Sequence, residues 1–365
     1  MQVDLNILED YVDRNLLRKQ EDEDLVQYNY SEYCNNNALW DEITMFNRGN
    51  IYEKKTGNLI ARAMPKFMNF GQHDEETQKV FLNRTFTVTE KLDGCLGILY
   101  KYKGKIRCNS RGSFDNYVTD KIKDIIDKKH YVLLNHLLEY QTLNVEVISP
   151  ETKIICDYGD EESLYLITSY STISWNENTR MTNDLISQCT YIPIVKQVNM
   201  TWDELLTWQK ESDGKEEGFV LCFENEDGTY DRVKVKSDDY MKIAAAKRNL
   251  CRHTLWKLMK SDLEQRTDLL SPYMDAVPDE LAKTAQRYYK EILDAMEVKQ
   301  KEAYDLYLET KDVPQKELCK VLMEKNPDLR GAVFNIRKGI PIDKILIKLI
   351  EPEPGFEDIG DMFNG

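Results

Sequence analysis

The sequence lacks the patterns that mark several large classes of protein. No apolar run approaches the roughly 18 residues that a membrane span needs, and the N-terminal stretch MQVDLNILEDYVDRN has no basic or apolar region typical of a secretory signal. The 8 cysteines are widely spaced without a CxxC pair, and the 4 histidines have no HxxxH spacing. We therefore expect a cytoplasmic protein without a membrane partner, a zinc site or a disulfide framework.

Positive charge is scarce overall but is concentrated in one part of the chain. The formal net charge of -15 over 365 residues argues against a polyanion bound over the whole surface. Between 231 and 260, however, nine bases stand against three acids. This stretch indicates either a phosphate-bearing partner held at one place or a helix with one solvated basic face, and charge alone does not decide between them.

Two segments of different periodicity predict two domains. From about 40 to 240, short alternating runs rich in β-branched and aromatic residues are separated by DG, KGK, RGS and EDG turns, which is typical of antiparallel strands. Helical spacing occurs there at 118–141 and 202–211, whereas after about 240 it dominates. We expect an α+β fold, with a domain at 1–245 built on antiparallel sheets with flanking helices and an all-α domain at 246–365.

The stretch EKLDGCLG, residues 90–97, places a lysine two positions before an Asp-Gly turn. A lysine amine attacks phosphorus or carbon only when it is deprotonated, so a nucleophilic Lys91 requires neighbours that lower its pKa from about 10.4. Other cations close by, together with burial, would have that effect. The alternative is a surface lysine before a hairpin, since K-x-D-G is short enough to occur by chance.

Charged residues further along the chain accompany this lysine in a fixed order. They are Arg111 in RCNSRGSFDN, Glu146 in TLNVEVIS, Glu217 in EEGFVL, and Lys234 and Lys236 in DRVKVKS. The last two are two residues apart, so on a strand both point to the same face and can converge on one phosphate. Each residue alone also suits an ordinary structural role, but together they favour one common site.

With this set in place, residues 25–245 resemble the covalent nucleotidyltransferase superfamily of ligases and capping enzymes, and more closely the bacteriophage RNA ligase 1 family. The resemblance implies that Lys91 takes AMP from ATP. It also implies that Asp93 and Gly94, in the turn of the KxDG motif, belong to the catalytic group. The glycine-containing turn would let the backbone approach the nucleotide closely.

The resemblance extends upstream through QYNYSEY, NRGNIYE and ARAMPKFMNFGQ. It implies that Tyr28 lies near the nucleotide and that Arg48 and Lys66 contact its triphosphate. Downstream, SRGS has the place of a family segment that usually reads SKGS, so Arg111 would replace a nucleotide-binding lysine. This departure keeps the charge but changes its geometry.

The remaining motifs imply roles at the α-phosphate and at a metal ion. KVKS resembles a motif whose lysines, here Lys234 and Lys236, touch the α-phosphate, and Tyr240 follows at the family's spacing. VEVISPETKI gives Glu146 a role near the ribose or the metal. EGFV assigns Glu217 to metal coordination, and the implied ion is Mg2+ or Mn2+. A further acid occurs in some members after this region, and Asp262 is our candidate for it.

Together these implications describe an ATP-dependent RNA ligase that joins 5′-phosphate and 3′-hydroxyl ends through a lysyl-AMP and an RNA-adenylate. The implied partners are RNA ends, in particular those of a nicked tRNA, and a polynucleotide kinase/phosphatase that prepares them. The implied protein is a monomer in the cytoplasm, which is the host cytosol if a phage encodes it. Resemblance also suggests that the helical domain contributes tRNA specificity.

Two alternatives stay open at this point. A capping guanylyltransferase or a DNA ligase of the same superfamily normally carries an OB-fold after the KVKS-type motif, where this chain turns helical instead. A catalytically inactive relative that only binds nucleotide is the other alternative, although such a relative would be expected to have lost at least one of the charged residues.

Overall fold

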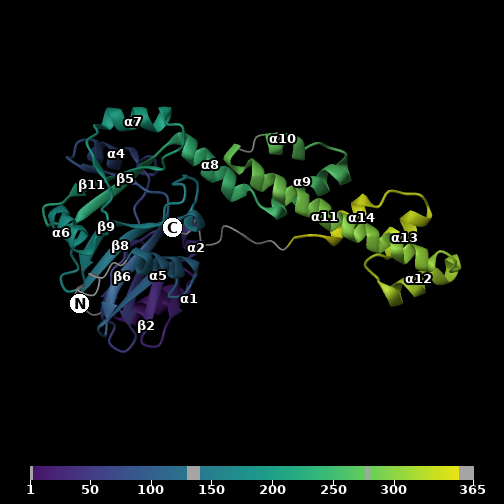
Figure 1. Ribbon diagram of the computed structural model, residues 1–365, viewed down its shortest axis with the longest axis horizontal. Coiled ribbons are helices and arrows are strands. Elements are labelled where there is room, and N and C mark those ends of the chain that lie inside the picture. Colours follow the sequence, from purple (N-terminus) through teal and green to yellow (C-terminus); the bar gives the residue numbers. More distant parts are fainter. Residues whose placement is uncertain (1–2, 130–139, 276–278, 353–365) are drawn as a thin grey trace. The chain divides into compact units, whose positions relative to one another are not determined.

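The structure, a computed structural model, describes residues 3–129, 140–275 and 279–352 (Figure 1). The chain divides into two compact units between Met241 and Lys242. The first unit combines three four-stranded antiparallel sheets with helices, and the described part of the second is helical. This confirms the predicted α+β class with a helical C-terminal region.

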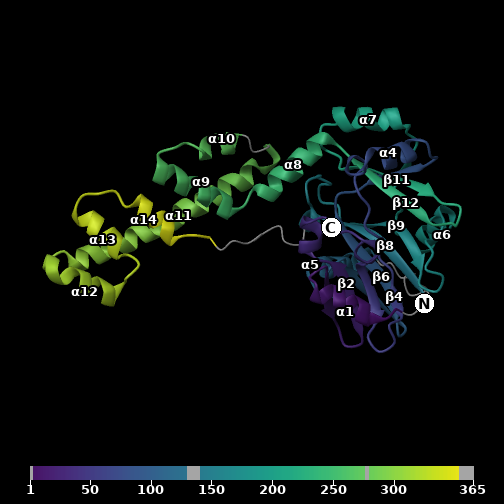
Figure 2. The ribbon, with the colours of Figure 1, turned by 180° about the vertical axis from the view of Figure 1, so that it is seen from behind.

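Sheet 1 has the strand order β1-β2-β3-β4, formed by Leu17–Glu21, Leu25–Tyr30, Arg48–Glu53 and Leu59–Ala61. Helix α1 (Leu5–Asp13) packs beside it in both views (Figures 1 and 2) and buries Leu8 against Leu17 and Tyr28. Two five-residue helices, α2 (Glu32–Asn36) and α3 (Glu42–Phe46), connect β2 to β3. Asp41 begins α3 with a capping box, which directs the chain back into the sheet.

Sheet 2 has the order β10-β5-β11-β12, formed by Gln197–Val198, Thr87–Lys91, Gly218–Glu224 and Tyr230–Lys236. Its apolar face is covered by α4 (Glu75–Leu82) and α7 (Trp202–Glu211), which contribute Phe81 and Leu205 to one core. Helix α7 confirms the helix predicted over 202–211. A short 3-10 helix, Phe70–Gln72, lies next to β12.

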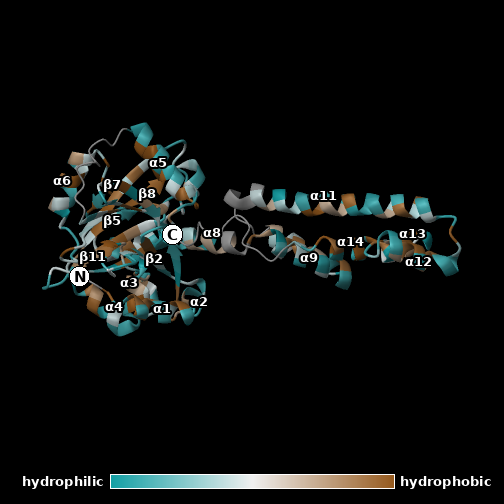
Figure 3. Ribbon diagram, turned by 90° about the horizontal axis from the view of Figure 1, so that it is seen from below, coloured by the Kyte–Doolittle hydropathy of each residue, from teal (hydrophilic) through white to brown (hydrophobic). Residues whose placement is uncertain are grey.

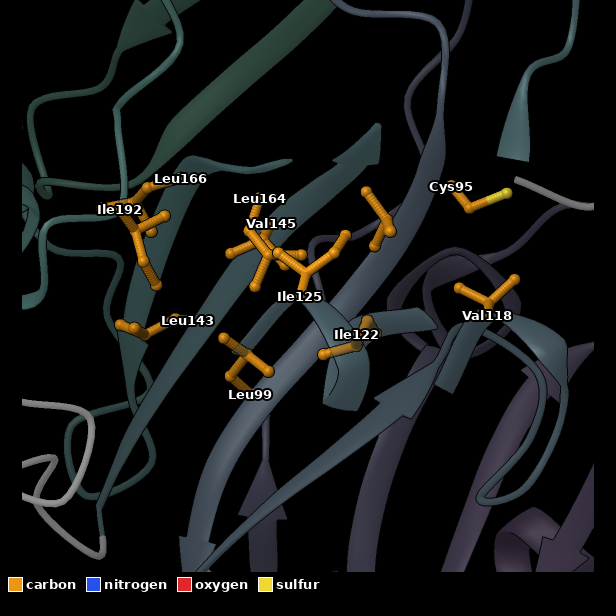
Figure 4. Packing of buried hydrophobic residues seen from close by; sticks show 11 residues of the cluster. Cys95, Leu99, Val118, Ile122, Ile125, Leu143, Val145, Leu164, Leu166 and Ile192 are labelled. Atoms are coloured by element: carbon orange, nitrogen blue, oxygen red, sulfur yellow. The ribbon is translucent and has the colours of Figure 1, made fainter. Parts of the chain in front are cut away.

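Sheet 3 has the order β7-β6-β8-β9, formed by Lys105–Ser110, Cys95–Tyr102, Gln141–Ile148 and Ser163–Ser171. Figure 4 shows its core, in which Ile122 and Ile125 of α5 (Tyr117–Lys129) pack against Leu99 and Val145. A second 3-10 helix, Pro150–Thr152, follows β8, and α6 (Arg180–Thr190) follows β9. The opposite face of the sheet packs on sheet 1 through Ile98 and Tyr100.

The helix predicted over 118–141 is shorter where it can be described. Helix α5 covers Tyr117–Lys129, residues 130–139 lie outside the described part, and Gln141 already begins β8. The apolar spacing of TLNVEVIS therefore belongs to a strand from its first residue onward.

The second unit contains the helices that follow the sheets. Helix α8 (Asp238–Asn249) spans the division, and the others are α9 (Arg252–Gln265), α10 (Leu270–Asp275), α11 (Asp279–Thr310), α12 (Gln315–Lys325), α13 (Arg330–Arg337) and α14 (Asp343–Leu349). Apolar and polar residues alternate along α11 (Figure 3), which buries Ala303 and Leu306 with Leu318 of α12. Within the described ranges, no helix has both the length and the apolar composition that a bilayer span requires.

Candidate active site

Lys91, Gly218 and Lys236 lie side by side on three neighbouring strands of sheet 2. In the antiparallel register, Gly218 of β11 faces Lys91 of β5 on one side and Lys236 of β12 on the other. Residues that face each other across strands share a face of the sheet. Glu217 joins the two lysines, since its carboxylate accepts a hydrogen bond of 2.7 Å from each Nζ. The Glu217 side chain is 4% exposed and that of Lys91 is 22% exposed.

The KLDG turn crosses from sheet 2 to sheet 3, because Lys91 ends β5 and Cys95 begins β6. It is therefore not a hairpin. A Cβ at Gly94 would lie 2.4 Å from the backbone oxygen of Val147, so only glycine fits this crossing. The backbone N–H of Gly94 donates to the Glu146 carboxylate at 3.0 Å. The turn thus brings Glu146 of β8 to the same site as Lys91.

Asp93 fixes the KLDG turn through its buried side chain. Its side chain is 1% exposed; one oxygen accepts backbone N–H groups of Ile155 and Cys156 at 2.7 Å, and the other accepts the Tyr240 hydroxyl at 2.6 Å. Tyr240 is buried as well, and the Nζ of Lys236 lies 5.0 Å from the centroid of its ring. These three hydrogen bonds hold the KLDG turn in position.

The protonation of Lys91 differs from the sequence-based expectation. Burial by itself would lower the pKa of Lys91, but the charges of Glu217 and Glu146 outweigh burial and raise it above its ordinary value. The prediction that neighbouring cations keep this amine neutral is therefore wrong for the free protein. Burial instead lowers the pKa of Lys234 well below its usual range, and Lys236 and Lys91 lower it further.

Lys66 lies on the extended segment 62–69, which connects sheet 3 to sheet 2. A backbone N–H of this segment donates to Asn144 of β8 at 2.8 Å, and near its other end a carbonyl accepts the backbone N–H of Lys234 at 3.1 Å. The segment therefore ties sheet 3 to sheet 2. The Nζ of Lys66 lies 4.3 Å from the ring of Trp40 and 5.1 Å from that of Tyr30. Burial lowers the pKa of Lys66, and the charges of Arg48 and Arg111 add to this effect.

Arg111 follows β7 and is 3% exposed. The Gln27 amide donates to the carbonyl of Ser110 at 2.8 Å and to that of Arg111 at 3.3 Å. Gly49 makes room for it, since a Cβ there would lie 2.8 Å from the Arg111 backbone oxygen. The guanidinium donates to the hydroxyl of Tyr30. Burial and the charge of Arg48 lower the pKa of Arg111 to about 10.

Two tyrosines of β2 have different surroundings. Tyr28, the residue predicted near the nucleotide, is 1% exposed and donates its hydroxyl to Glu9 of α1 at 2.6 Å. Tyr30, which the sequence analysis did not single out, lies among the cations. Burial would raise the pKa of Tyr30, but Arg111, with Arg48 and Lys66, brings it to about 8. Only its position two residues after Tyr28 could have drawn attention to it.

Glu146 and Glu217 are the acids available to a metal ion at this site. Burial raises the pKa of Glu146 to about 7, and repulsion from Glu217 adds to it, although Lys91 counteracts both. A buried carboxylate with a raised pKa is stabilised in its charged form by a nearby divalent cation. Among the described residues, no group of three or more His, Cys, Asp or Glu is close enough to form a metal site. Two carboxylates nevertheless fit Mg2+, which retains waters and also takes phosphate oxygens.

Asp262, the third predicted metal ligand, belongs to α9 in the second unit. Its carboxylate accepts the hydroxyl of Thr267 at 2.8 Å and the backbone N–H groups of Leu269 and Leu270. These bonds close the turn between α9 and α10, which is a local structural role.

The basic stretch at 231–260 is not one surface. Arg232 forms an ion pair with Glu177 in which the two side chains are 11% and 9% exposed. Lys234 and Lys236 belong to the site, whereas Arg252 pairs with Glu291 at 2.5 Å in the second unit. The interpretation of the whole stretch as one solvated helical face is therefore wrong.

Comparison with known proteins gives the following matches. The profile of a family described as RNA ligase matches residues 47–240. A putative RNA ligase of Thermovibrio ammonificans is 30% identical over 118 residues, which are 32% of this chain and 31% of the relative. RNA ligase 1 of bacteriophage TS2126 is 31% identical over 130 residues, which are 33% of each chain. The chain thus covers about a third of the length of these relatives.

Among solved structures, a putative ATP-dependent DNA ligase from Aquifex aeolicus has a TM-score of 0.45 at 17% identity, over 82% of this chain and 81% of that one.

Proposed function

The chain belongs to the RNA ligase family, and from that premise we propose that it joins a 5′-phosphate and a 3′-hydroxyl RNA end, with ATP as the donor of AMP. The observation that supports this most is the row of positive side chains that begins at Lys91. It continues through Lys236 and Lys234 to Lys66 and then to the arginines around Tyr30. A triphosphate laid along such a row has cations both at the phosphorus under attack and at the departing pyrophosphate.

Lys91 is the nucleophile in the first step. Its Nζ forms a bond to the α-phosphorus of ATP, the bond from that phosphorus to the pyrophosphate oxygen breaks, and the amine loses its proton. Glu217 accepts the hydrogen bond of the Lys91 ammonium at 2.7 Å and is therefore placed to receive this proton. Because the pKa of Lys91 is raised in the free protein, the rate of this step should increase with pH through the alkaline range.

Lys234 and Lys236 stabilise charge at the α-phosphate. Lys236 is paired with Glu217, whereas Lys234, whose pKa is lowered, gains its proton most readily when phosphate charge arrives. Glu146 and Glu217 would hold Mg2+ or Mn2+, which neutralises phosphate charge when bound. In the later steps AMP passes to the RNA 5′-phosphate, and the 3′-hydroxyl attacks that phosphate and releases AMP.

The finer assignments are part of the same proposal. Residues 1–245 would form the adenylyltransferase domain and 246–365 a helical domain that recognises tRNA-like ends. Broken tRNA would be the substrate, a polynucleotide kinase/phosphatase would prepare its ends, and a monomer would act in the cytoplasm.

A labelling experiment tests the first step. The protein is incubated with ATP or GTP labelled at the α-phosphate and with Mg2+ or Mn2+, and denaturing electrophoresis then detects covalent label. We expect label from ATP that disappears in Lys91→Ala and persists in Lys105→Ala, an exposed control lysine on β7. Adenylylation that survives Lys91→Ala would refute the assignment.

The same experiment separates the rival functions. Labelling by GTP in place of ATP would indicate a capping-type guanylyltransferase, and no labelling with either metal would indicate an inactive relative. Sealing of nicked duplex DNA in preference to a broken tRNA anticodon loop would indicate a DNA ligase.

A further inference from the structure

Arg232, Lys234 and Lys236 project from the same face of β12, because they alternate along one strand. This is the face on which Lys236 pairs with Glu217. In the order of sheet 2, β12 is the last strand, so Lys234 lies on an edge strand. Beyond that edge, the backbone N–H of Lys234 donates to the carbonyl of Met68 at 3.1 Å. The position of Lys234 therefore depends on what holds this edge strand in place.

Lys234 is repelled by the other cations of the site. Burial lowers its pKa, and the largest charge effects that lower the pKa further come from Lys236, Lys91, Lys66 and Arg48. While no ligand is bound, this repulsion acts to push the lysine and its strand outward. An edge strand has a neighbouring strand on one side, so it yields to such a force more readily than an inner strand. An attachment on the same face of β12 is needed to oppose it.

Arg232 provides such an attachment two residues before Lys234. Its guanidinium donates to the carboxylate of Glu177, and the two side chains are 11% and 9% exposed. Burial by itself would lower the pKa of Arg232, but the charge of Glu177 outweighs burial and raises it. Two residues after Lys234, Lys236 is bound to Glu217 at 2.7 Å. Lys234 thus lies between two residues of its own strand that are each paired with a carboxylate.

Glu177 is fixed in turn by sheet 3. The chain turns back after β9, and Glu177 pairs with Tyr170 in an isolated antiparallel bridge. Its carboxylate accepts the hydroxyl of Thr168 at 2.5 Å and that of Tyr170 at 3.1 Å. β9 is hydrogen-bonded to β8, which carries Glu146. The ion pair with Arg232 therefore links β12 to the strand of Glu146.

Segment 172–178, which bears this glutamate, is held at a second point. The ring of Trp175 stacks on Phe46 of α3, with the centroids 5.5 Å apart and an interplanar angle of 6°. The guanidinium of Arg62, which begins the extended segment 62–69, lies 5.3 Å from the centroid of the same Phe46 ring. Neither contact involves β12. Segment 172–178 is therefore a fixed point to which the edge strand can be tied.

We propose that the ion pair of Arg232 and Glu177 positions Lys234 against the α-phosphate in the first step of ligation, by tying β12 to segment 172–178. This inference rests on the proposed function. Arg232 and Glu177 act through Lys234 and are positioning residues. Two apolar side chains could pack in their place without the cost of burying charge, so stability alone does not require an ion pair here. A forked guanidinium bound to a carboxylate fixes direction as well as distance.

The decisive variant combines Arg232→Met with Glu177→Gln. It removes both charges and keeps side chains of similar length, and the glutamine oxygen can still accept the hydroxyls of Thr168 and Tyr170. We expect the melting temperature to stay within about 3 °C of wild type or to rise. The rate constant of adenylylation at saturating ATP should fall about 10-fold or more. The ATP concentration for half-maximal rate should change by less than about 2-fold, because Lys234 acts on charge that develops in the transition state.

Asp231→Asn is the matched control. Asp231 is the neighbour of Arg232 on β12, lies on the opposite face and pairs with Arg84 at 2.6 Å. Breaking this more exposed ion pair should leave the rate constant within about 2-fold of wild type. In each variant the final amount of adenylate counts folded protein, whereas the rate constant reports on the site. A rate constant of the double variant within about 2-fold of wild type, or a loss confined to the final amount of adenylate, would overturn the proposal.

A chemical measurement tests the same pair without relying on activity. The ligand-free protein is treated with acetic anhydride, and mass spectrometry compares the acetylation rate of Lys234 with that of the exposed Lys105. The double variant at Arg232 and Glu177 should raise this ratio about 3-fold or more, because a released edge strand exposes Lys234, and Asp231→Asn should leave it unchanged. If wild-type protein forms no adenylate but the ratio rises in the double variant, the proposed function fails and the positioning of Lys234 stands. An unchanged ratio would refute the positioning even if wild-type protein forms the adenylate.

Discussion

The two ends of the cation row are compensated in opposite ways. At the Lys91 end, Glu217 bonds both Lys91 and Lys236 at 2.7 Å, and Glu146 lies beside them. At the other end, Arg48, Arg111 and Lys66 act on the Tyr30 phenol. Buried guanidinium nitrogens of Arg18, Arg48 and Arg111 have no partner in the described part of the chain.

This difference shows what each end requires. At the Lys91 end, the Glu217 carboxylate holds Lys91 and Lys236 in place without a ligand. The arginine end keeps buried nitrogens without partners in the described part of the chain, so it gains most from a bound anion. Removing Glu217 at one end and Arg111 at the other should therefore change stability in opposite directions.

The largest effect is expected for Glu217→Ala. It leaves the Lys91 and Lys236 ammonium groups without their shared partner in a site where the Glu217 side chain is 4% exposed. The free energy of unfolding should fall by about 3 to 5 kcal/mol, the range for breaking a buried ion pair, as measured by urea denaturation. Glu224→Ala, on the exposed end of the same strand, is the control. A fall as small as that of the control would mean that the Lys91 end is not held by this carboxylate.

A smaller and pH-dependent effect is expected for Glu146→Gln. Burial raises the pKa of Glu146 to about 7 from an ordinary value of 4.5, so its protonated form stabilises the fold below about pH 4.5 and this contribution is lost as pH rises through 7. Glutamine does not titrate, and its oxygen can still accept the N–H of Gly94. The variant should be more stable than wild type at pH 8 by up to about 3 kcal/mol, with little difference at pH 4.5. Thermal unfolding at the two pH values checks this, and an equal difference at both would contradict it.

The smallest effect, and one of opposite sign to that at Glu217, is expected for Arg111→Met. Replacing a buried charge that lacks a carboxylate by an apolar side chain of similar length should stabilise the ligand-free protein by about 1 to 2 kcal/mol. The same variant should lose most of its adenylylation at low ATP concentration. Urea denaturation and the labelling assay measure the two effects. A loss of stability comparable to that of Glu217→Ala would remove the contrast between the two ends.

Much of the fold followed from local patterns. The alternation in KIRCNS and LGILYKY corresponds to β7 and β6, and the helical spacing at 202–211 corresponds to α7. The spacing of Lys234 and Lys236 predicted a shared face, and both lysines do lie at the site. Their different surroundings could not be predicted, because Glu217 pairs with Lys236, whereas Lys234 lies among cations that lower its pKa.

No sequence motif indicated that Arg18 and Asn29 lie near Arg48. Arg18 in LLRKQ and Asn29 in QYNYS are ordinary strand residues, and only the register of β1, β2 and β3 makes them neighbours of Arg48.

The sequence by itself determined the strands and helices, the two periodic regions and the charged motifs, because these depend on residues a few positions apart. The tertiary structure decided the charge of Lys91, the hydrogen bonds of Asp93 and the buried arginine nitrogens that lack partners in the described part of the chain. These depend on burial and on cross-strand register, which bring together residues that are tens to hundreds of positions apart.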